Sequence, residues 1–150
     1  MAMYFVQHGL CVAKEIDPEQ PLSDAGRKEV ERVAIHLRKA GVAVGRIFHS
    51  GKTRARQTAE LLAEQVGFDH IDERAGMKPN DDVVEFVATL EDDAMYVGHL
   101  PHLAKLVSYL AAGDEAGEVV RFSNGGVVCI GKDDAGYYVE WFVTPALCNV

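Results

Sequence analysis

Short apolar runs separated by amphipathic stretches constrain the fold of this chain more than any other feature. The runs lie at residues 3–6, 47–49 and 94–97, and each has the length of a short buried strand. The stretches between them place apolar residues three or four positions apart, which is typical of helices. Strands that alternate with helices in this way favour an α/β fold with a mainly parallel sheet.

The expected helices carry recognisable signals at their ends. Ser23 is a suitable N-cap for a helix that extends to about Lys39, and Gly41 closes it because glycine readily adopts the left-handed conformation. Further helices are expected at residues 53–66 before Gly67, after Asn80-Asp81-Asp82 with Val83, Val87 and Leu90 inward, and after Pro101 with Leu103, Leu106, Val107 and Leu110 inward.

The last part of the chain has a different pattern. Three strands are expected after Gly113, at residues 118–122, 126–130 and 137–142, the last two joined by a turn at residues 132–136. The whole pattern predicts an α/β three-layer sandwich, with a mainly parallel central sheet, added antiparallel strands and helices on both faces. No repeat or linker divides the sequence, so we expect one domain over residues 1–150.

Charge and composition exclude several classes of protein. The formal net charge is −8, which argues against general nucleic-acid binding. Cys11, Cys129 and Cys148 are few, odd in number and widely spaced, so a disulfide framework is not expected. No signal peptide or membrane-spanning run is evident, which makes a cytoplasmic protein the default expectation.

Basic residues nevertheless gather in one stretch of this acidic chain. Seven of the fifteen Lys and Arg residues lie between Arg32 and Ala59, where there is no acidic residue. Arg54 falls in the first turn of an expected helix, where free backbone N–H groups and the helix dipole favour an anion. A guanidinium there adds a planar fork of donors that matches two phosphate oxygens. The stretch therefore indicates a local anion site.

Two histidines follow two of the expected strands. His8 lies in Gln7-His8-Gly9, and His99 lies in Gly98-His99-Leu100-Pro101. The carboxyl ends of parallel strands form the edge at which α/β sheets place their ligands. A neutral imidazole is a competent nucleophile toward phosphorus at neutral pH. His8, His99 and Arg54 at one edge therefore predict a phosphate site that contains a nucleophile.

Other interpretations of these residues are open. His8 could be a core histidine, and His8, His49 and His99 with a carboxylate could bind zinc, although no metal-binding motif supports this and a nearby arginine opposes it. Ser50-Gly51-Lys52-Thr53 resembles the end of a Walker A loop, but Gly45 is one residue too early.

Several polar side chains near these motifs also have two readings. Asp81 and Asp82 are candidate proton donors, or they serve only the N-terminus of a helix. His102 is expected to be partly exposed on its helix, and Cys11 to be a small buried residue.

Taken together, the motifs resemble the histidine phosphatase superfamily. The resemblance covers Gln7-His8-Gly9, Pro21-Leu22-Ser23 with Gly26, residues 50–59 and Gly98-His99-Leu100-Pro101. The short chain, without a large inserted cap, resembles the SixA-type phosphohistidine phosphatases and implies a phosphoglycerate mutase-like fold. By this resemblance His8 is the nucleophile that becomes phosphorylated, and Arg54 and His99 bind the phosphoryl group. The resemblance implies further substrate contacts from Gln7, Gly9, Gln20, Ser50, Lys52 and Leu100.

The chain departs from the family pattern at three positions. Gln7 and Gln20 stand where the family has arginine, and Gly51 stands where it usually has proline. The resemblance implies hydrolysis of a phosphohistidine on a protein, without a metal or other cofactor. The alternatives are a weakly active or non-catalytic module that binds phosphohistidine, and a phosphatase for small molecules. We expect no nucleic-acid or membrane partner, and a monomer or weak dimer.

Overall fold

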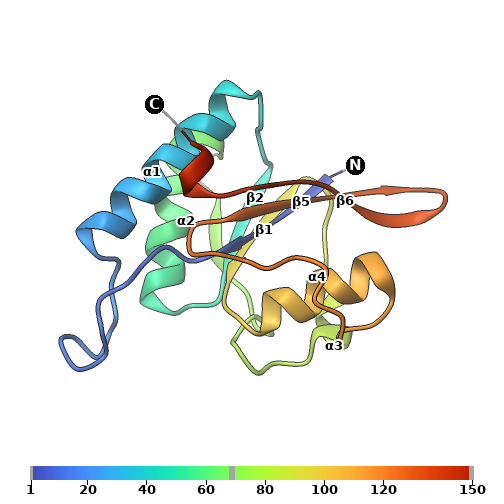
Figure 1. Cartoon of the computed structure of the whole chain (residues 1–150), viewed down its shortest axis with the longest axis horizontal. Helices are drawn as coiled ribbons and strands as arrows, with labels where there is room; N and C mark the ends of the chain where they lie inside the picture. The colour runs from blue at the N-terminus through green and yellow to red at the C-terminus, as the bar shows by residue number, and fades with distance from the viewer. Residues whose placement is uncertain (1, 68–69, 149–150) are drawn as a thin grey trace.

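The computed structural model describes residues 2–67 and 70–148, and a six-stranded sheet lies at its centre (Figure 1). The strands are β1 (Ala2–Gln7), β2 (Arg46–His49), β3 (Ile71–Glu73), β4 (Ala94–Gly98), β5 (Val127–Asp133) and β6 (Gly136–Val143). Their order across the sheet is β3-β2-β4-β1-β5-β6. Strands β1 to β4 pair in parallel, whereas β5 and β6 add an antiparallel hairpin. The expected α/β architecture is confirmed.

Helices cover both faces of this sheet. They are α1 (Asp24–Lys39), α2 (Thr53–Val66), α3 (Val83–Val87) and α4 (His102–Ala112), followed by the 3-10 helix η1 (Pro145–Leu147). Figure 1 shows α1 and α2 together on one side and α3 and α4 on the other. Side chains of β1 alternate between the two layers, since Phe5 packs in the core under α3 and α4, and Val6 packs in the core under α1 and α2.

The ends of the helices follow the chemistry of the sequence. The Ser23 hydroxyl accepts a hydrogen bond from the Gly26 N–H at 3.0 Å and caps α1. Gly41 has φ +86°, the left-handed conformation that suits the residue after a helix. Helix α2 spans residues 53–66 as predicted, and α4 begins directly after Pro101. These local signals therefore fix how the helices enter and leave the sheet.

Four features of the secondary structure differ from expectation. Residues 118–122 form no strand; Val120 and Phe122 are buried, yet the segment pairs with no strand of the sheet. The edge strand β3 was not predicted. Helix α3 has only five residues, so Leu90 lies beyond its end and is half-buried. The turn between β5 and β6 is also tighter than expected, because the strands extend to Asp133 and from Gly136.

The sheet order explains where functional side chains can meet. Strands β2, β4 and β1 are parallel neighbours, so the residues that follow them emerge at one edge of the sheet.

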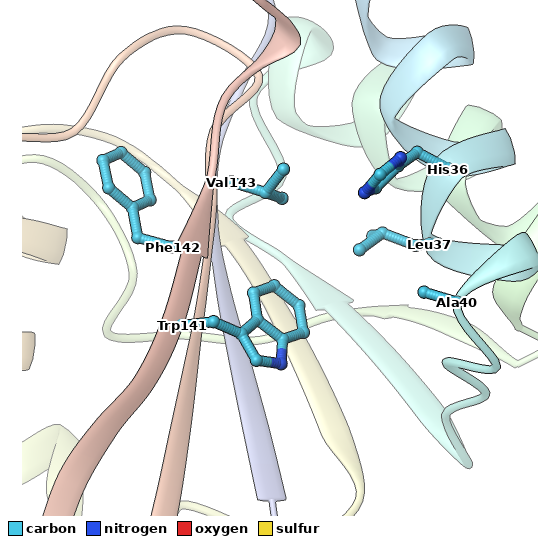
Figure 2. A pocket seen from close by; sticks show the side chains of 6 residues that line it. All are labelled: His36, Leu37, Ala40, Trp141, Phe142 and Val143. Carbon is cyan, nitrogen blue, oxygen red and sulfur yellow. The ribbon is translucent and has the colours of Figure 1, made fainter. Parts of the chain in front are cut away.

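The C-terminal end of α1 and strand β6 form a groove of about 300 Å³. It is lined by His36, Leu37, Ala40, Trp141, Phe142 and Val143 (Figure 2). Of the helices that the structure describes, none has the length and apolarity needed to cross a membrane.

Candidate active site

His8 leaves the end of β1 with its backbone held on two sides. Its N–H donates to the Gly98 carbonyl at 3.1 Å, and its carbonyl accepts from the Asn124 side-chain amide at 3.1 Å. The imidazole Nδ1 lies 2.7 Å from the Gly9 carbonyl oxygen. Because a carbonyl oxygen only accepts, Nδ1 carries the hydrogen and Nε2 keeps its lone pair. The fold thus presents one tautomer of His8, with Nε2 free to attack.

Arg54 faces that free nitrogen from the first turn of α2. Its Nε donates toward His8 Nε2 at 3.4 Å. The Thr58 hydroxyl joins the two segments, since it donates to the Arg54 carbonyl at 2.8 Å and accepts from the Gly9 N–H at 3.0 Å. A Cβ at Gly9 would lie 2.7 Å from Val30 Cγ2, so the close approach of this turn to α1 requires glycine. Arg54 is therefore aimed at the atom that would attack phosphorus.

His99 follows β4 and lies beside His8, with 5.1 Å between the ring centroids. It is 2% exposed, and its Nε2 lies 2.6 Å from the Ser50 hydroxyl oxygen. That oxygen also accepts from the Lys52 N–H at 3.3 Å. When the Ser50 hydroxyl donates to Nε2, the His99 Nδ1 carries the ring hydrogen. The Nδ1 atom is buried and has no partner among the described residues, so it is the ring nitrogen left for a ligand.

Both histidines are held in their neutral forms. Burial lowers the pKa of His8, and the charge of Arg54 lowers it further, against the opposing effect of the Gly9 carbonyl. Burial also lowers the pKa of His99 to about 3, and the neighbouring His8 and Arg54 act in the same direction. A neutral His8 is the form that a nucleophile requires.

The other residues predicted to contact the substrate differ in burial and in their hydrogen bonds. Gln7 is 9% exposed, and its buried Oε1 has no hydrogen-bond partner in the described chain. Lys52 is the N-cap of α2, and Leu100 is 39% exposed beside His99. The Gln20 amide donates to the Val12 carbonyl at 3.4 Å and is thus bonded within its own loop. The roles of Gln7, Lys52 and Leu100 in the site stay predictions, and the Gln20 side chain is engaged away from His8.

The two aspartates are distinguished by their contacts. Asp82 caps α3, with its Oδ1 accepting from the Val84 N–H at 2.8 Å. Asp81 accepts from the Lys78 N–H at 2.9 Å and lines a hollow of about 320 Å³ that Ser50 also lines. Asp81 therefore lines a hollow beside Ser50, whereas the Asp82 side chain caps α3.

Some readings of single residues are wrong or lose support. His102 is 1% exposed rather than partly exposed, because its ring packs inward under the β3–α3 connection. Cys11 is half-buried rather than buried. His49 Nδ1 accepts from the Gly51 N–H, and within residues 2–67 and 70–148 no three potential metal ligands gather. Residues 46–49 form β2, so the segment before Gly51 is a strand and not a phosphate-binding loop.

Sequence reasoning missed two residues that support the site. Thr58 ties the Gly9 turn to α2, and Asn124 ties the loop before β5 to His8. Thr58 lies in the same helix as Arg54, one turn later, which is the spacing that brings side chains onto one face. Asn124 is 116 residues from His8, and no local pattern connects them.

Comparison with known proteins gives a consistent picture. Residues 3–78 match the family described as the histidine phosphatase superfamily (branch 1). An uncharacterized protein of Picosynechococcus sp. is 30% identical over 138 residues, which are 85% of this chain and 83% of that protein. The structure of the protein histidine phosphatase SixA complexed with tungstate superposes with a TM-score of 0.87 at 21% identity, over 97% of this chain and 98% of the other. The α-ribazole phosphatase from Shigella flexneri gives a TM-score of 0.79 at 14% identity, over 100% and 99% of the two chains.

Proposed function

The chain belongs to the histidine phosphatase superfamily, a group of phosphatases, and on that premise we propose that it removes phosphate from a phosphohistidine on another protein. The observation that carries the proposal is the geometry of His8. Its Nε2 keeps a lone pair, faces Arg54 Nε at 3.4 Å and lies beside a second neutral histidine. A nucleophile, a cation and an unpaired donor at one point are what phosphoryl transfer needs.

The proposed reaction has two steps. His8 Nε2 attacks the phosphorus in line, the bond from phosphorus to the substrate imidazole breaks, and the departing nitrogen takes a proton. Arg54 and the His99 Nδ1–H stabilise the equatorial oxygens. Water then attacks the phosphorus of phospho-His8 and gives a proton to the group that protonated the leaving nitrogen. The bond from phosphorus to Nε2 breaks, so inorganic phosphate leaves and the imidazole is restored. Asp81, in the hollow next to Ser50, is the proposed proton donor to the leaving group.

The surface around the two histidines supports a protein substrate over a small molecule. Leu10 and Leu100 follow His8 and His99 almost directly in sequence, and they are 41% and 39% exposed. We propose that a protein substrate packs against these two side chains, which belong to the loops that carry the histidines. A phosphatase for small molecules is the second candidate, because relatives of this fold include an α-ribazole phosphatase.

A phosphohistidine-labelled phosphotransfer domain tests the reaction. The wild-type chain should release phosphate over many turnovers and carry an acid-labile label, whereas His8→Ala should do neither. A His8→Ala protein that retains full activity would refute the mechanism. A label that accumulates on His8 without release would indicate the binding module with slow hydrolysis.

A second experiment separates the two substrate classes. Leu10→Ser should raise the KM for the phosphorylated domain and leave hydrolysis of free phosphoimidazole unchanged, since only the protein is large enough to contact Leu10. Val119→Ser is the matched control, because Val119 is 45% exposed and lies in a different segment. If Leu10→Ser has no effect on the protein substrate, the small-molecule candidate is favoured.

A further inference from the structure

His102 is a buried polar residue that the reaction above does not use. It is 1% exposed, and neither ring nitrogen has a hydrogen-bond partner of full geometry within the described chain, although the Gly76 backbone lies close to the ring. The ring of Phe86 meets it edge-on, with 5.4 Å between centroids and 70° between planes. Buried polar groups in proteins are nearly always paired, so a histidine with two unpaired nitrogens calls for an explanation.

The loop of residues 74–82, between β3 and α3, covers this histidine. Burial lowers the pKa of His102, while the Asp81 carboxylate and the Gly76 backbone lie close enough to act in the opposite direction. Lys105, on α4, is the other charged group near the ring, and it lowers the pKa further. The neutral imidazole therefore has one N–H to donate, and the Gly76 carbonyl is the nearby acceptor.

The same loop also borders the phosphate site. The Met77 carbonyl oxygen lies 3.6 Å from the position that a Cβ would take on Gly98, the residue before His99. Asp81 and Ser50 line one hollow, and Ser50 is hydrogen-bonded to His99. The loop thus contacts the end of β4 before His99 and the start of α4 after it.

From this arrangement we propose that His102 is a positioning residue, which holds residues 74–82, and with them Asp81, against the phosphate site. The ring fills the space between Phe86 and the loop and offers its N–H to Gly76. Because the ring is neutral, it does not form an ion pair that would draw Asp81 away from the leaving group. The inference rests on the proposed function, since it needs Asp81 as the proton donor.

Two phosphoryl donors with different leaving groups test the inference. Phenyl phosphate needs a proton on its leaving oxygen, whereas p-nitrophenyl phosphate departs readily without one. Asp81→Asn should therefore slow phosphorylation of His8 by phenyl phosphate at least about ten-fold more than phosphorylation by p-nitrophenyl phosphate. His102→Phe keeps an aromatic ring beside Phe86 but removes the N–H, and it should reproduce this selective loss.

Three further variants test whether His102 acts by positioning Asp81. The double variant Asp81→Asn, His102→Phe should be no slower than Asp81→Asn alone. Each change removes the same contribution, which is protonation of the leaving oxygen by Asp81. His102→Gln, which restores an N–H donor, should recover part of the rate with phenyl phosphate. His36→Phe replaces a histidine in the groove of Figure 2 and should leave both rates unchanged.

Each other outcome has a defined meaning. Equal slowing of both donors by His102→Phe, or effects of the two single variants that multiply, would overturn the inference. A wild-type chain that phosphorylates His8 while Asp81→Asn shows no dependence on the leaving group would also overturn it. That result would remove Asp81 from the proposed reaction, whereas dephosphorylation through phospho-His8 would stand. A wild-type chain that forms no phosphohistidine from any donor would refute the proposed function itself.

Discussion

At the scale of single residues, the chemistry of His8 depends on contacts that leave its Nε2 unprotonated. The Gly9 carbonyl takes the hydrogen on Nδ1, and Arg54 faces the other nitrogen. Burial and the arginine charge both lower the pKa of His8. The nucleophile is therefore prepared by its surroundings before any substrate binds.

The lowered pKa of His8 predicts a particular pH dependence. Activity needs the neutral imidazole, so kcat/KM should fall only as the pH drops below the lowered pKa, on the acid side of 6.5. Arg54→Gln removes a cation beside the ring, and it should raise the pKa of His8 in an NMR titration of the free protein. An acid limb at or above pH 6.5 in the wild-type chain would contradict the prediction.

Gln7 stands where the resemblance to the family implies an arginine. Loss of a charged donor from a transition-state site costs roughly 2.7–4 kcal/mol by analogy with oxyanion holes, or about 10²–10³ in rate. Gln7→Arg should therefore raise kcat/KM for phosphoimidazole by up to about 10². Gln20→Arg is the matched control and should change the rate less, because the Gln20 amide is bonded within its own loop. Equal effects of the two changes would refute the assignment of Gln7 to the site.

At the scale of elements, α1 and the turn after His8 approach each other closely. A Cβ on Gly26 would lie 2.0 Å from the Leu10 carbonyl oxygen, which is backbone and cannot move alone. Gly26→Ala should therefore reduce the free energy of unfolding by about 1–3 kcal/mol and lower kcat, because the displaced turn carries His8. Lys28→Ala, at an exposed position of the same helix, should change stability by less than about 0.5 kcal/mol. Urea denaturation and steady-state kinetics on both variants measure the difference.

The elements that were predicted correctly are those with strong local signals. Ser23 and Gly41 bound α1, and the apolar run of β1 could form only a buried strand. Strand β3 was missed because its three residues carry one apolar side chain and its pairing with β2 is not local. Residues 118–122 bury Val120 and Phe122 as a strand would, but they pair with no strand of the sheet. Periodicity indicates burial, and it does not indicate a pairing partner.

At the scale of the whole molecule, the site exists because parallel strands end together. The sequence predicted that His8, Arg54 and His99 meet, since both histidines follow apolar runs typical of parallel strands and Arg54 opens the helix after another such run. It did not predict that His102 is buried or that Asp81 lies near it, because both depend on how the loop of residues 74–82 packs. The loop has no periodic pattern from which its path could be inferred.

This assembly buries His49, His99 and His102 and partly buries His8, and their combined titration should make the fold sensitive to acid. Burial lowers the pKa of His8, His49, His99 and His102, so the unfolded chain binds protons near pH 6.5 that the folded chain does not bind. The free energy of unfolding should therefore rise with pH in this range and be lost as the pH falls below about 6.5. With its pKa of about 3, His99 alone should cost about 2 kcal/mol at pH 5.

His102→Phe removes one of these proton-binding groups and should make the dependence of stability on pH shallower between pH 7 and 5. Chemical denaturation of the wild-type chain and the variant across this range measures both slopes. Equal slopes would show that His102 binds its proton equally well in the folded and unfolded chains. A steeper slope in the variant would mean that the phenylalanine has changed the burial of the remaining histidines, above all His99 one turn away.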